Sequence, residues 1–325
     1  MNKLRRSLAL MVGLLAAWPA AQSQVPGWPA KPIRLVVTFP PGGSSDAAAR
    51  IVAPRLAERL GQPVVVDNRP GAGGGVGLEL VARAPADGYT IVLASAGGLT
   101  ANPSLYKQLS YDPVRDFAPV TLFGTSPFVL LAHPTLPAGN VGELLALARS
   151  QPGRLSYASG GNGTAMHLSG ELLKSMGQVH IVHIPYRGSA PAVTAVMGGE
   201  TQLAIADITT VAGQLKSGRL KVLGVMGKDR SALAPEFPSL NESGLRGYES
   251  SGWFAILAPA ATPTAVVQRL QAEITAVLRS PEVRERFTAV GLEPLPSTSE
   301  ELSNLMKSET QKWARVIRES GARVD

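Results

Sequence analysis

Residues 33–61 have the sequence IRLVVTFPPGGSSDAAARIVAPRLAERLG, and this stretch decides the fold. Ile33–Phe39 is mostly apolar and rich in β-branched side chains, which predicts a buried strand. Pro40–Gly43 ends that strand. Ser44, Ser45 and Asp46 are candidate caps of a helix expected over 47–60, which ends at Gly61. A buried strand followed by a glycine turn and a helix indicates a parallel sheet with helices on its faces.

The same alternation continues along the chain. A second strand is expected at 63–67 and a third at 89–95, with a glycine-rich loop and a helix at 76–84 between them. Ser297 and Ser299 are candidate caps of a helix expected at 300–320. Further strands are expected at 155–158, 179–185, 203–206 and 220–226, and further helices at 141–150, 164–176, 190–197, 209–216, 263–279 and 300–320.

Two longer apolar segments interrupt the alternation. Residues 117–133 and 248–259 are each long enough to leave one sheet and enter another. Two such crossings predict an α/β fold with two doubly wound lobes, in which residues 25–125 plus 250–325 form the first lobe and residues 126–249 the second. A ligand would then bind between the lobes, at the carboxyl ends of the strands, and the lobes would close by a hinge motion.

The N-terminus has the pattern of a secretory signal peptide. Three basic residues precede an apolar run of about a dozen residues, which is too short to span a bilayer core that needs about 20. Cleavage is expected after Ser23, or after Ala21, so residues 1–23 form the signal peptide. Sec export is favoured over the twin-arginine route because the residues around the arginine pair match that route weakly.

Composition excludes several classes of protein. The 325 residues include 31 Lys+Arg, 24 Asp+Glu and no Cys, which rules out disulfides, thiolate metal sites and a cysteine nucleophile. The net charge of +7 falls to +4 without the signal peptide, and basic residues alternate with acids, so no nucleic-acid partner is expected. His180 and His183 would point to opposite faces of a strand, and Gly71–Gly77 does not match the dinucleotide motif. The sequence therefore predicts neither a metal nor a cofactor.

Two glycine-rich turns are candidate ligand sites. Pro41–Asp46 and Ser159–Thr164 each place small residues and hydroxyls directly before a helix, where free N–H groups and the helix dipole favour an anion. The alternative is that each turn is an ordinary capped connection. Asp46 either holds its own turn, which we favour, or receives a ligand ammonium. Asp207, at a later strand end, either caps a helix or faces the ligand.

Several longer motifs resemble one known family. The resemblance rests on WPAKPIRLVVTFPPGGSSDAAARIVAPRLAERLGQPVVVDNRPGAGGGVG at 28–77, ADGYTIVLAS at 86–95, NPSLYKQLSYDPVRDFAPV at 102–120 and IPYRGSAPAV at 184–193. These stretches are similar to those of the Bug family, the TctC-type periplasmic substrate-binding receptors of tripartite tricarboxylate transporters. The resemblance covers essentially the whole chain after the signal peptide.

This resemblance implies a type II periplasmic-binding-protein fold and a small carboxylate held by backbone amides, hydroxyls and ordered waters. It also implies a soluble periplasmic monomer that contacts a two-subunit membrane transporter transiently. Matched residue by residue, with Ser95 at the end of the third strand added, the implied ligand-binding residues are Pro41, Gly42, Gly43, Ser44, Ser45, Asp46, Ser95, Ser159, Gly160, Gly161, Gly163, Thr164, His167, Tyr186, Gly188, Ser189 and Asp207.

We therefore expect a receptor, not an enzyme, for a mono- or dicarboxylate or for an amino or aromatic acid. Two alternatives stay open at this point. One is an exported sensor that presents its closed lobes to a signalling protein. The other is a secreted hydrolase with Ser44 or Ser159 as nucleophile, which needs a base within hydrogen-bond reach. His167 is the only candidate base in the sequence.

Overall fold

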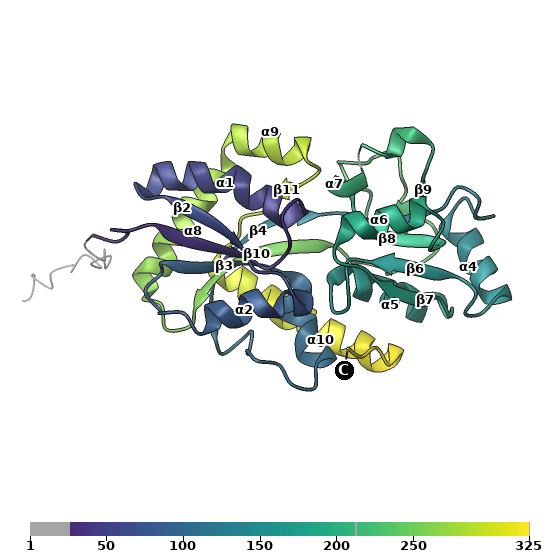
Figure 1. Ribbon diagram of the computed structural model, residues 1–325, viewed down its shortest axis with the longest axis horizontal. Coiled ribbons are helices and arrows are strands. Elements are labelled where there is room, and N and C mark those ends of the chain that lie inside the picture. Colours follow the sequence, from purple (N-terminus) through teal and green to yellow (C-terminus); the bar gives the residue numbers. More distant parts are fainter. Residues whose placement is uncertain (1–26, 212, 325) are drawn as a thin grey trace, which may run out of the picture.

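The computed structural model describes residues 27–211 and 213–324, which form two α/β lobes lying end to end (Figure 1). The predicted two-lobed α/β fold is confirmed. The predicted signal peptide, residues 1–23, and its cleavage site lie outside the described residues. Within the described part of the chain, no helix combines the length and the apolar character needed to cross a membrane.

The first lobe is built on a six-stranded sheet. Across the sheet, the strands follow the order β11 (Glu293–Pro294), β4 (Phe117–Ser126), β10 (Gly252–Pro259), β3 (Thr90–Ser95), β1 (Ile33–Val37) and β2 (Val64–Asn68). β1 pairs in parallel with β2 and with β3. β10 lies between β3 and β4 and is antiparallel to both. A strand from late in the chain therefore completes the middle of this sheet.

Helices cover both faces of the first sheet. On one face, α1 (Ser44–Leu60), α8 (Thr264–Arg279) and α9 (Pro281–Ala289) share an apolar core with the sheet. On the other face lie α2 (Gly75–Ala82) and α10 (Ser299–Ser320), which Figure 1 shows below the sheet. The short elements of this lobe are η1 (Ala72–Gly74), η2 (Gly97–Ala101) and α3 (Asn102–Leu105).

The second lobe is built on a five-stranded sheet. Its order is β7 (Val182–Pro185), β6 (Ser156–Ser159), β8 (Leu203–Asp207), β5 (Phe128–Ala132) and β9 (Lys221–Val225). β6 is parallel to β7 and β8, whereas β5 is antiparallel to β8 and β9. The remaining elements are α4 (Val141–Ser150), α5 (Ala165–Gly177), α6 (Ser189–Met197), α7 (Ile208–Val211) and η3 (Leu215–Ser217).

Two connections carry the chain between the sheets. The chain leaves β4 at Ser126 and enters β5 at Phe128, so Pro127 marks the first connection. It leaves β9 at Val225 and returns to the first sheet at Gly252. α10 adds a contact that the sequence did not predict, because this helix packs against α5 of the second lobe as well as against β4. The residue boundaries predicted for the two lobes remain a prediction.

The structure corrects several predicted details. Ser44, Ser45 and Asp46 were expected as caps, but α1 already begins at Ser44, and Gly43, in an extended conformation, is the N-cap. α10 is capped by Thr298, whose hydroxyl accepts from the Glu301 amide. Neither Ser297 nor Ser299 caps it, because Ser297 instead bonds β4 through the Leu122 amide.

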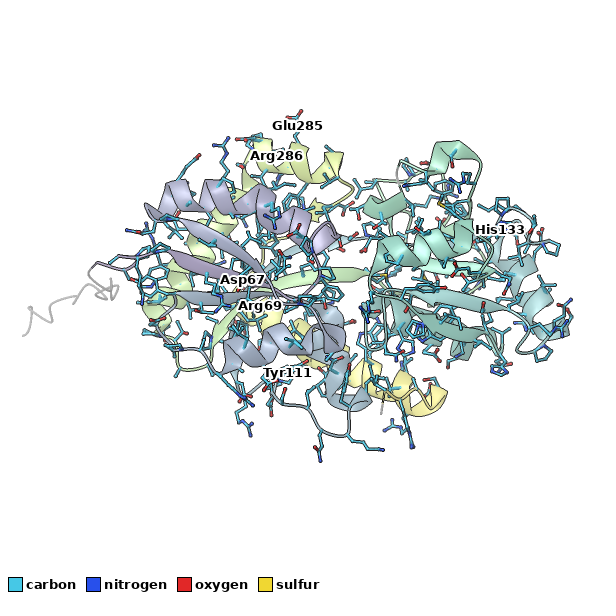
Figure 2. All side chains as sticks on the ribbon, in the orientation of Figure 1. Asp67, Arg69, Tyr111, His133, Glu285 and Arg286 are labelled. Atoms are coloured by element: carbon cyan, nitrogen blue, oxygen red, sulfur yellow. The ribbon has the colours of Figure 1, made fainter. Side chains whose placement is uncertain are left out.

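Two more elements were not anticipated. α9 and β11 both lie between the last two predicted helices. α9 begins at Pro281, where the fixed φ of proline suits the first turn of a helix, and Ser280 caps it. Its outer face carries mixed charge, with Glu285 and Arg286 exposed at the top of the first lobe (Figure 2).

Candidate functional site

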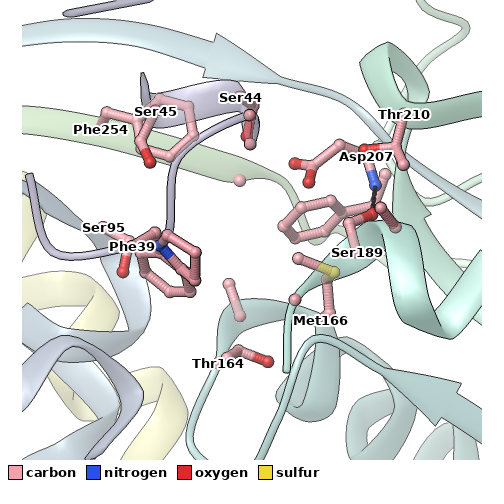
Figure 3. Close-up of a pocket in the computed structure, with 18 of the residues that line it drawn as sticks. Phe39, Ser44, Ser45, Ser95, Thr164, Met166, Ser189, Asp207, Thr210 and Phe254 are labelled. Atoms are coloured by element: carbon pink, nitrogen blue, oxygen red, sulfur yellow. Dashed lines mark hydrogen bonds between the residues drawn. The ribbon is translucent and has the colours of Figure 1, made fainter. Parts of the chain in front are cut away.

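A cavity of about 270 Å³ lies between the two lobes (Figure 3). The first lobe contributes the turn after β1, the start of α1, Ser95 and the beginning of β10. The second lobe contributes Phe128, the start of α5, the turn before α6, and the end of β8. Of the predicted ligand-binding residues, those that line this cavity are Pro41, Gly42, Gly43, Ser44, Ser45, Ser95, Thr164, Gly188, Ser189 and Asp207.

The first-lobe turn presents the amino end of α1 to this cavity. α1 has 17 residues, and no side chain caps it, so its first amides remain available. The first backbone bond at this end runs from the Ala47 amide to the Gly43 carbonyl. The Ser44 and Ser45 hydroxyls lie beside these amides, and both serines are more than nine-tenths buried. Amides and hydroxyls at a helix N-terminus form a good site for an anion.

Asp46 holds this turn from behind. It does not line this cavity, and its carboxylate accepts from the Gly42 amide, from Arg50 Nε and from Asn68 Nδ2, each at 3.0 Å. Asn68 Nδ2 also donates to the Phe39 carbonyl at 3.0 Å. Burial alone would raise the pKa of Asp46, but the hydrogen bonds from Arg50, Gly42 and Asn68 lower it below its ordinary value. Asp46 is therefore an ionised positioning residue.

Two buried polar atoms in the cavity have no partner. Ser95 Oγ and Trp253 Nε1 make no hydrogen bond, although Ser95 is only 8% exposed and Trp253 only 5%. A buried donor without a partner costs on the order of 1–3 kcal/mol. Such a cost is relieved when a ligand oxygen or an ordered water accepts from these groups. Both residues line the cavity, so its chemistry favours a ligand with hydrogen-bond acceptors.

Asp207 lies across the cavity at the end of β8. Its carboxyl group points toward Ser44, and Thr210 lies beside it (Figure 3). Burial raises the pKa of Asp207 to about 6, although hydroxyls of Ser126, Ser44 and Ser189 oppose the rise. Its own amide donates to Ser189 Oγ at 3.1 Å. Asp207 therefore lines the cleft, as one of its two predicted roles requires.

The second-lobe turn lines a neighbouring cavity of about 550 Å³. Gly160, Gly161, Thr164, Tyr186 and Gly188 border it, so these predicted residues face the cleft. Thr164 caps α5 by accepting from the His167 amide. The turn also meets the first lobe closely, because a Cβ atom at Gly97 would lie 2.6 Å from the Gly163 carbonyl oxygen. Glycine is therefore required where the lobes touch.

Three predicted residues of this turn and of the helix after it line neither cavity, namely Ser159, Gly163 and His167. The Gly163 amide donates to His167 Nδ1 at 3.3 Å, and the Gly161 amide donates to Ser159 Oγ at 3.2 Å. His167 and Ser159 thus hold the turn from the side away from the cleft. Burial lowers the pKa of His167 to about 4, with Lys174 lowering it further and Glu171 opposing.

The sequence did not reveal the role of His183. His167 was the only candidate base for Ser159, but His183 Nε2 lies 2.6 Å from Ser159 Oγ. The ring of His183 stacks on that of His167, with centroids 4.1 Å apart. β6 and β7 are neighbours with Tyr157 opposite His183, which brings Ser159 to the same side of the sheet. Burial, together with His167 and Lys174, lowers the pKa of His183 to about 3.

This serine–histidine pair lacks the access that a nucleophile needs. Ser159 has no solvent exposure, and its hydroxyl accepts from the Gly161 amide.

His133, by contrast, lies at the outer end of the second lobe, where it bonds Thr135 (Figure 2). Among the described residues, no three His, Asp or Glu side chains are grouped as a metal site would require.

The apolar side of the site was not predicted from the sequence. Phe39, Phe128, Met166, Trp253 and Phe254 line the main cavity. The predicted residues are mostly glycines and polar residues of turns, whereas these side chains belong to strand ends and to a helix. Phe128 and Trp253 lie within or beside the segments predicted to cross between lobes, which was the available signal.

Comparison with known proteins agrees with this geometry. The family model described as the tripartite tricarboxylate transporter family receptor matches residues 48–322. The chain belongs to this family. Its relative BugT of Bordetella pertussis is 36% identical over 325 residues, which are 100% of each chain. Receptors of this family are periplasmic solute-binding proteins rather than enzymes.

Solved structures of related receptors share the fold. Rpa4515 of R. palustris with adipate has a TM-score of 0.85 and 34% sequence identity, covering 90% of this chain and 98% of that one. MatC (Rpa3494) from Rhodopseudomonas palustris with bound malate has a TM-score of 0.82 and 30% identity, covering 89% of this chain and 100% of that one. Both of those receptors therefore carry a small carboxylate.

Proposed function

We propose that this receptor binds a small carboxylate between its lobes and delivers it to a membrane transporter. The observation that carries the proposal is that the first turn of α1, which no side chain caps, lines the cavity together with Ser95, whose hydroxyl has no partner. Carboxylate oxygens accept from amides and hydroxyls, and the positive end of the helix dipole favours their charge. The adipate and malate bound to its relatives support the same class of ligand.

The cleft also suits a receptor that must release its ligand. Its donors are neutral hydroxyls and amides, and Arg187, the one basic side chain among the described residues that line it, is exposed. Neutral donors, helped by bridging waters, bind a carboxylate without the strong attraction of a buried cation. Closure of two lobes around the ligand would then give the membrane partner a surface that differs from the open form.

Isothermal titration of the chain from residue 24 onward with mono- and dicarboxylates tests this function. We expect at least one carboxylate to bind and to raise the unfolding temperature. Ser95→Ala should weaken that binding roughly tenfold, because one donor is lost. Ser104→Ala, at an exposed position on α3, is the matched control. Absence of binding across the panel would contradict the proposal.

The transport role needs a separate measurement. Uptake of the bound carboxylate should disappear when the gene for this receptor is deleted, and should return when it is restored. If uptake persists while a signalling response to the same ligand is lost, the sensor alternative is correct. Of the two serines named for the hydrolase alternative, Ser159 has no solvent exposure, so the site gives no support to Ser159 as a nucleophile.

A further inference from the structure

Aromatic side chains from both lobes are among the residues that line the cavity between them. Phe39 and Phe254 come from the first lobe, and Phe128 and Met166 come from the second. Phe39, Phe254, Ser45 and Ser95 all line this cavity (Figure 3), so aromatic rings share it with the donors proposed to hold the carboxylate. Flat rings stack well against other rings and lose little conformational freedom on binding.

The local backbone makes room for one of these rings. A Cβ atom at Gly252 would lie 2.6 Å from Cζ of Phe128, so the absence of a side chain there allows the ring to lie at the cavity. Phe128 begins β5 and is 3% exposed, and Gly252 begins β10. The ring therefore sits where the chain passes between the lobes, and it is held by both sheets.

Polar groups lie at two ends of this cavity. Ser45 and Ser95 lie at one end, whereas Asp207 and Thr210 lie at the other (Figure 3). Phe39, Phe128, Met166 and Phe254 add carbon surface to the lining. A short, highly polar acid would leave this surface in contact with water, whereas a ring between the two ends would cover it. Burying apolar surface contributes roughly 25 cal/mol per Å².

We propose that the ligand of this receptor is an acid with an aromatic ring, held between Phe39 and Phe254 of one lobe and Phe128 and Met166 of the other. This inference rests on the proposed carboxylate-binding function and narrows it to one class of acid. Phe128 is then a residue that determines specificity, because its ring contacts the body of the ligand rather than the carboxylate.

Titration with five probes tests the class of ligand. Benzoate, 4-hydroxybenzoate and phenylacetate carry an aromatic ring. Cyclohexanecarboxylate has a saturated ring and the same carbon count as benzoate, and adipate is an open-chain acid. We expect the tightest aromatic probe to bind at least tenfold more tightly than adipate, and benzoate several-fold more tightly than cyclohexanecarboxylate. Quenching of Trp253, which lines the cavity, gives a second readout of the same binding.

Substitution of Phe128 tests the assigned residue. Phe128→Leu keeps an apolar side chain but removes the ring, and it should lower the affinity for the aromatic probe about tenfold while changing adipate binding less than threefold. Phe237→Leu is the matched control, because Phe237 packs in the second lobe without lining the cavity. Phe254→Leu, in the other lobe, repeats the test if Phe128→Leu fails to fold.

The outcomes separate this inference from the broader function. Adipate binding as tightly as every aromatic probe would overturn the aromatic class and leave a carboxylate receptor. Equal losses for adipate and the aromatic probes in Phe128→Leu and Phe254→Leu would overturn the specificity role of the rings. If none of the probes and no other carboxylate binds, the proposed function fails as well.

Discussion

The two turns of the cleft have similar sequences but are held by different chemistry. In the first lobe, the ionised Asp46 carboxylate accepts from Gly42, Arg50 and Asn68. In the second lobe, the neutral side chains of His167 and Ser159 accept from Gly163 and Gly161. Similar backbone turns can thus depend on a charge in one lobe and on the absence of charge in the other. We therefore expect acid to change the stability of the two lobes by different amounts.

The largest expected effect concerns His167. Its pKa is 6.5 in an unfolded chain and about 4 in the fold, so the unfolded state takes up the proton first. Stability is therefore present above pH 6.5 and is lost as the pH falls toward 4, by about 3 kcal/mol. His167→Asn, whose oxygen can still accept from Gly163, should remove most of this loss.

Urea unfolding at pH 7.5 and pH 4.5 gives the free energy of unfolding lost on acidification. The effect is the difference between this loss in the unchanged chain and in His167→Asn. His180→Asn is the control, because His180 is exposed and outside the turn. An unchanged acid dependence in His167→Asn would mean that the second turn does not depend on a neutral histidine.

The contribution of Asp207 to stability should change with pH in the opposite direction to that of His167. Its pKa is raised from 3.8 to about 6, so the fold binds this proton more tightly than the unfolded chain does. Its contribution to stability is present below pH 3.8 and is lost as the pH rises to about 6, again by about 3 kcal/mol. Asp207→Asn should therefore stabilise the ligand-free chain at pH 8 by up to that amount, as urea unfolding can check. A less stable variant at pH 8 would show that the carboxylate is held by contacts that asparagine cannot replace.

Removal of the Asp46 carboxylate should cost less. Asp46→Ala leaves the Gly42 amide and Asn68 without their acceptor, which costs about 2 kcal/mol. The Arg50 side chain is about half exposed, so its ion pair adds little. Asp46→Asn, which keeps one acceptor oxygen, should recover part of the loss in thermal unfolding. Equal losses in both variants would show that the charge itself matters more than the hydrogen bonds.

The smallest expected effect is that of Ser159→Ala. The variant loses the hydrogen bonds to His183 and from the Gly161 amide, and we expect about 1 kcal/mol of destabilisation. Ligand affinity measured by titration should fall only slightly, because Ser159 lines neither cavity. A loss of affinity above tenfold would indicate that the whole second turn moves when this anchor is removed.

The sequence predicted those parts of the fold that depend on local order. The first strand, its glycine turn and α1 follow from adjacent residues, and the turn at Ser159–Thr164 follows from the same pattern. The Ser159–His183 contact did not, because it depends on β6 and β7 being neighbours in the sheet. Likewise, the aromatic lining needs both sheets in place, since Phe128 and Phe254 approach one cavity from separate lobes.

The position of β10 sets the order in which the lobes can be completed. The sheet of the second lobe uses strands between residues 128 and 225, whereas the first sheet needs β10, at Gly252–Pro259, between β3 and β4. During synthesis from the N-terminus, β3 and β4 therefore wait without their shared partner strand until residue 259 has been made. Unpaired strand edges promote aggregation, so the lobe that begins the chain is the one most exposed to misfolding before translation ends.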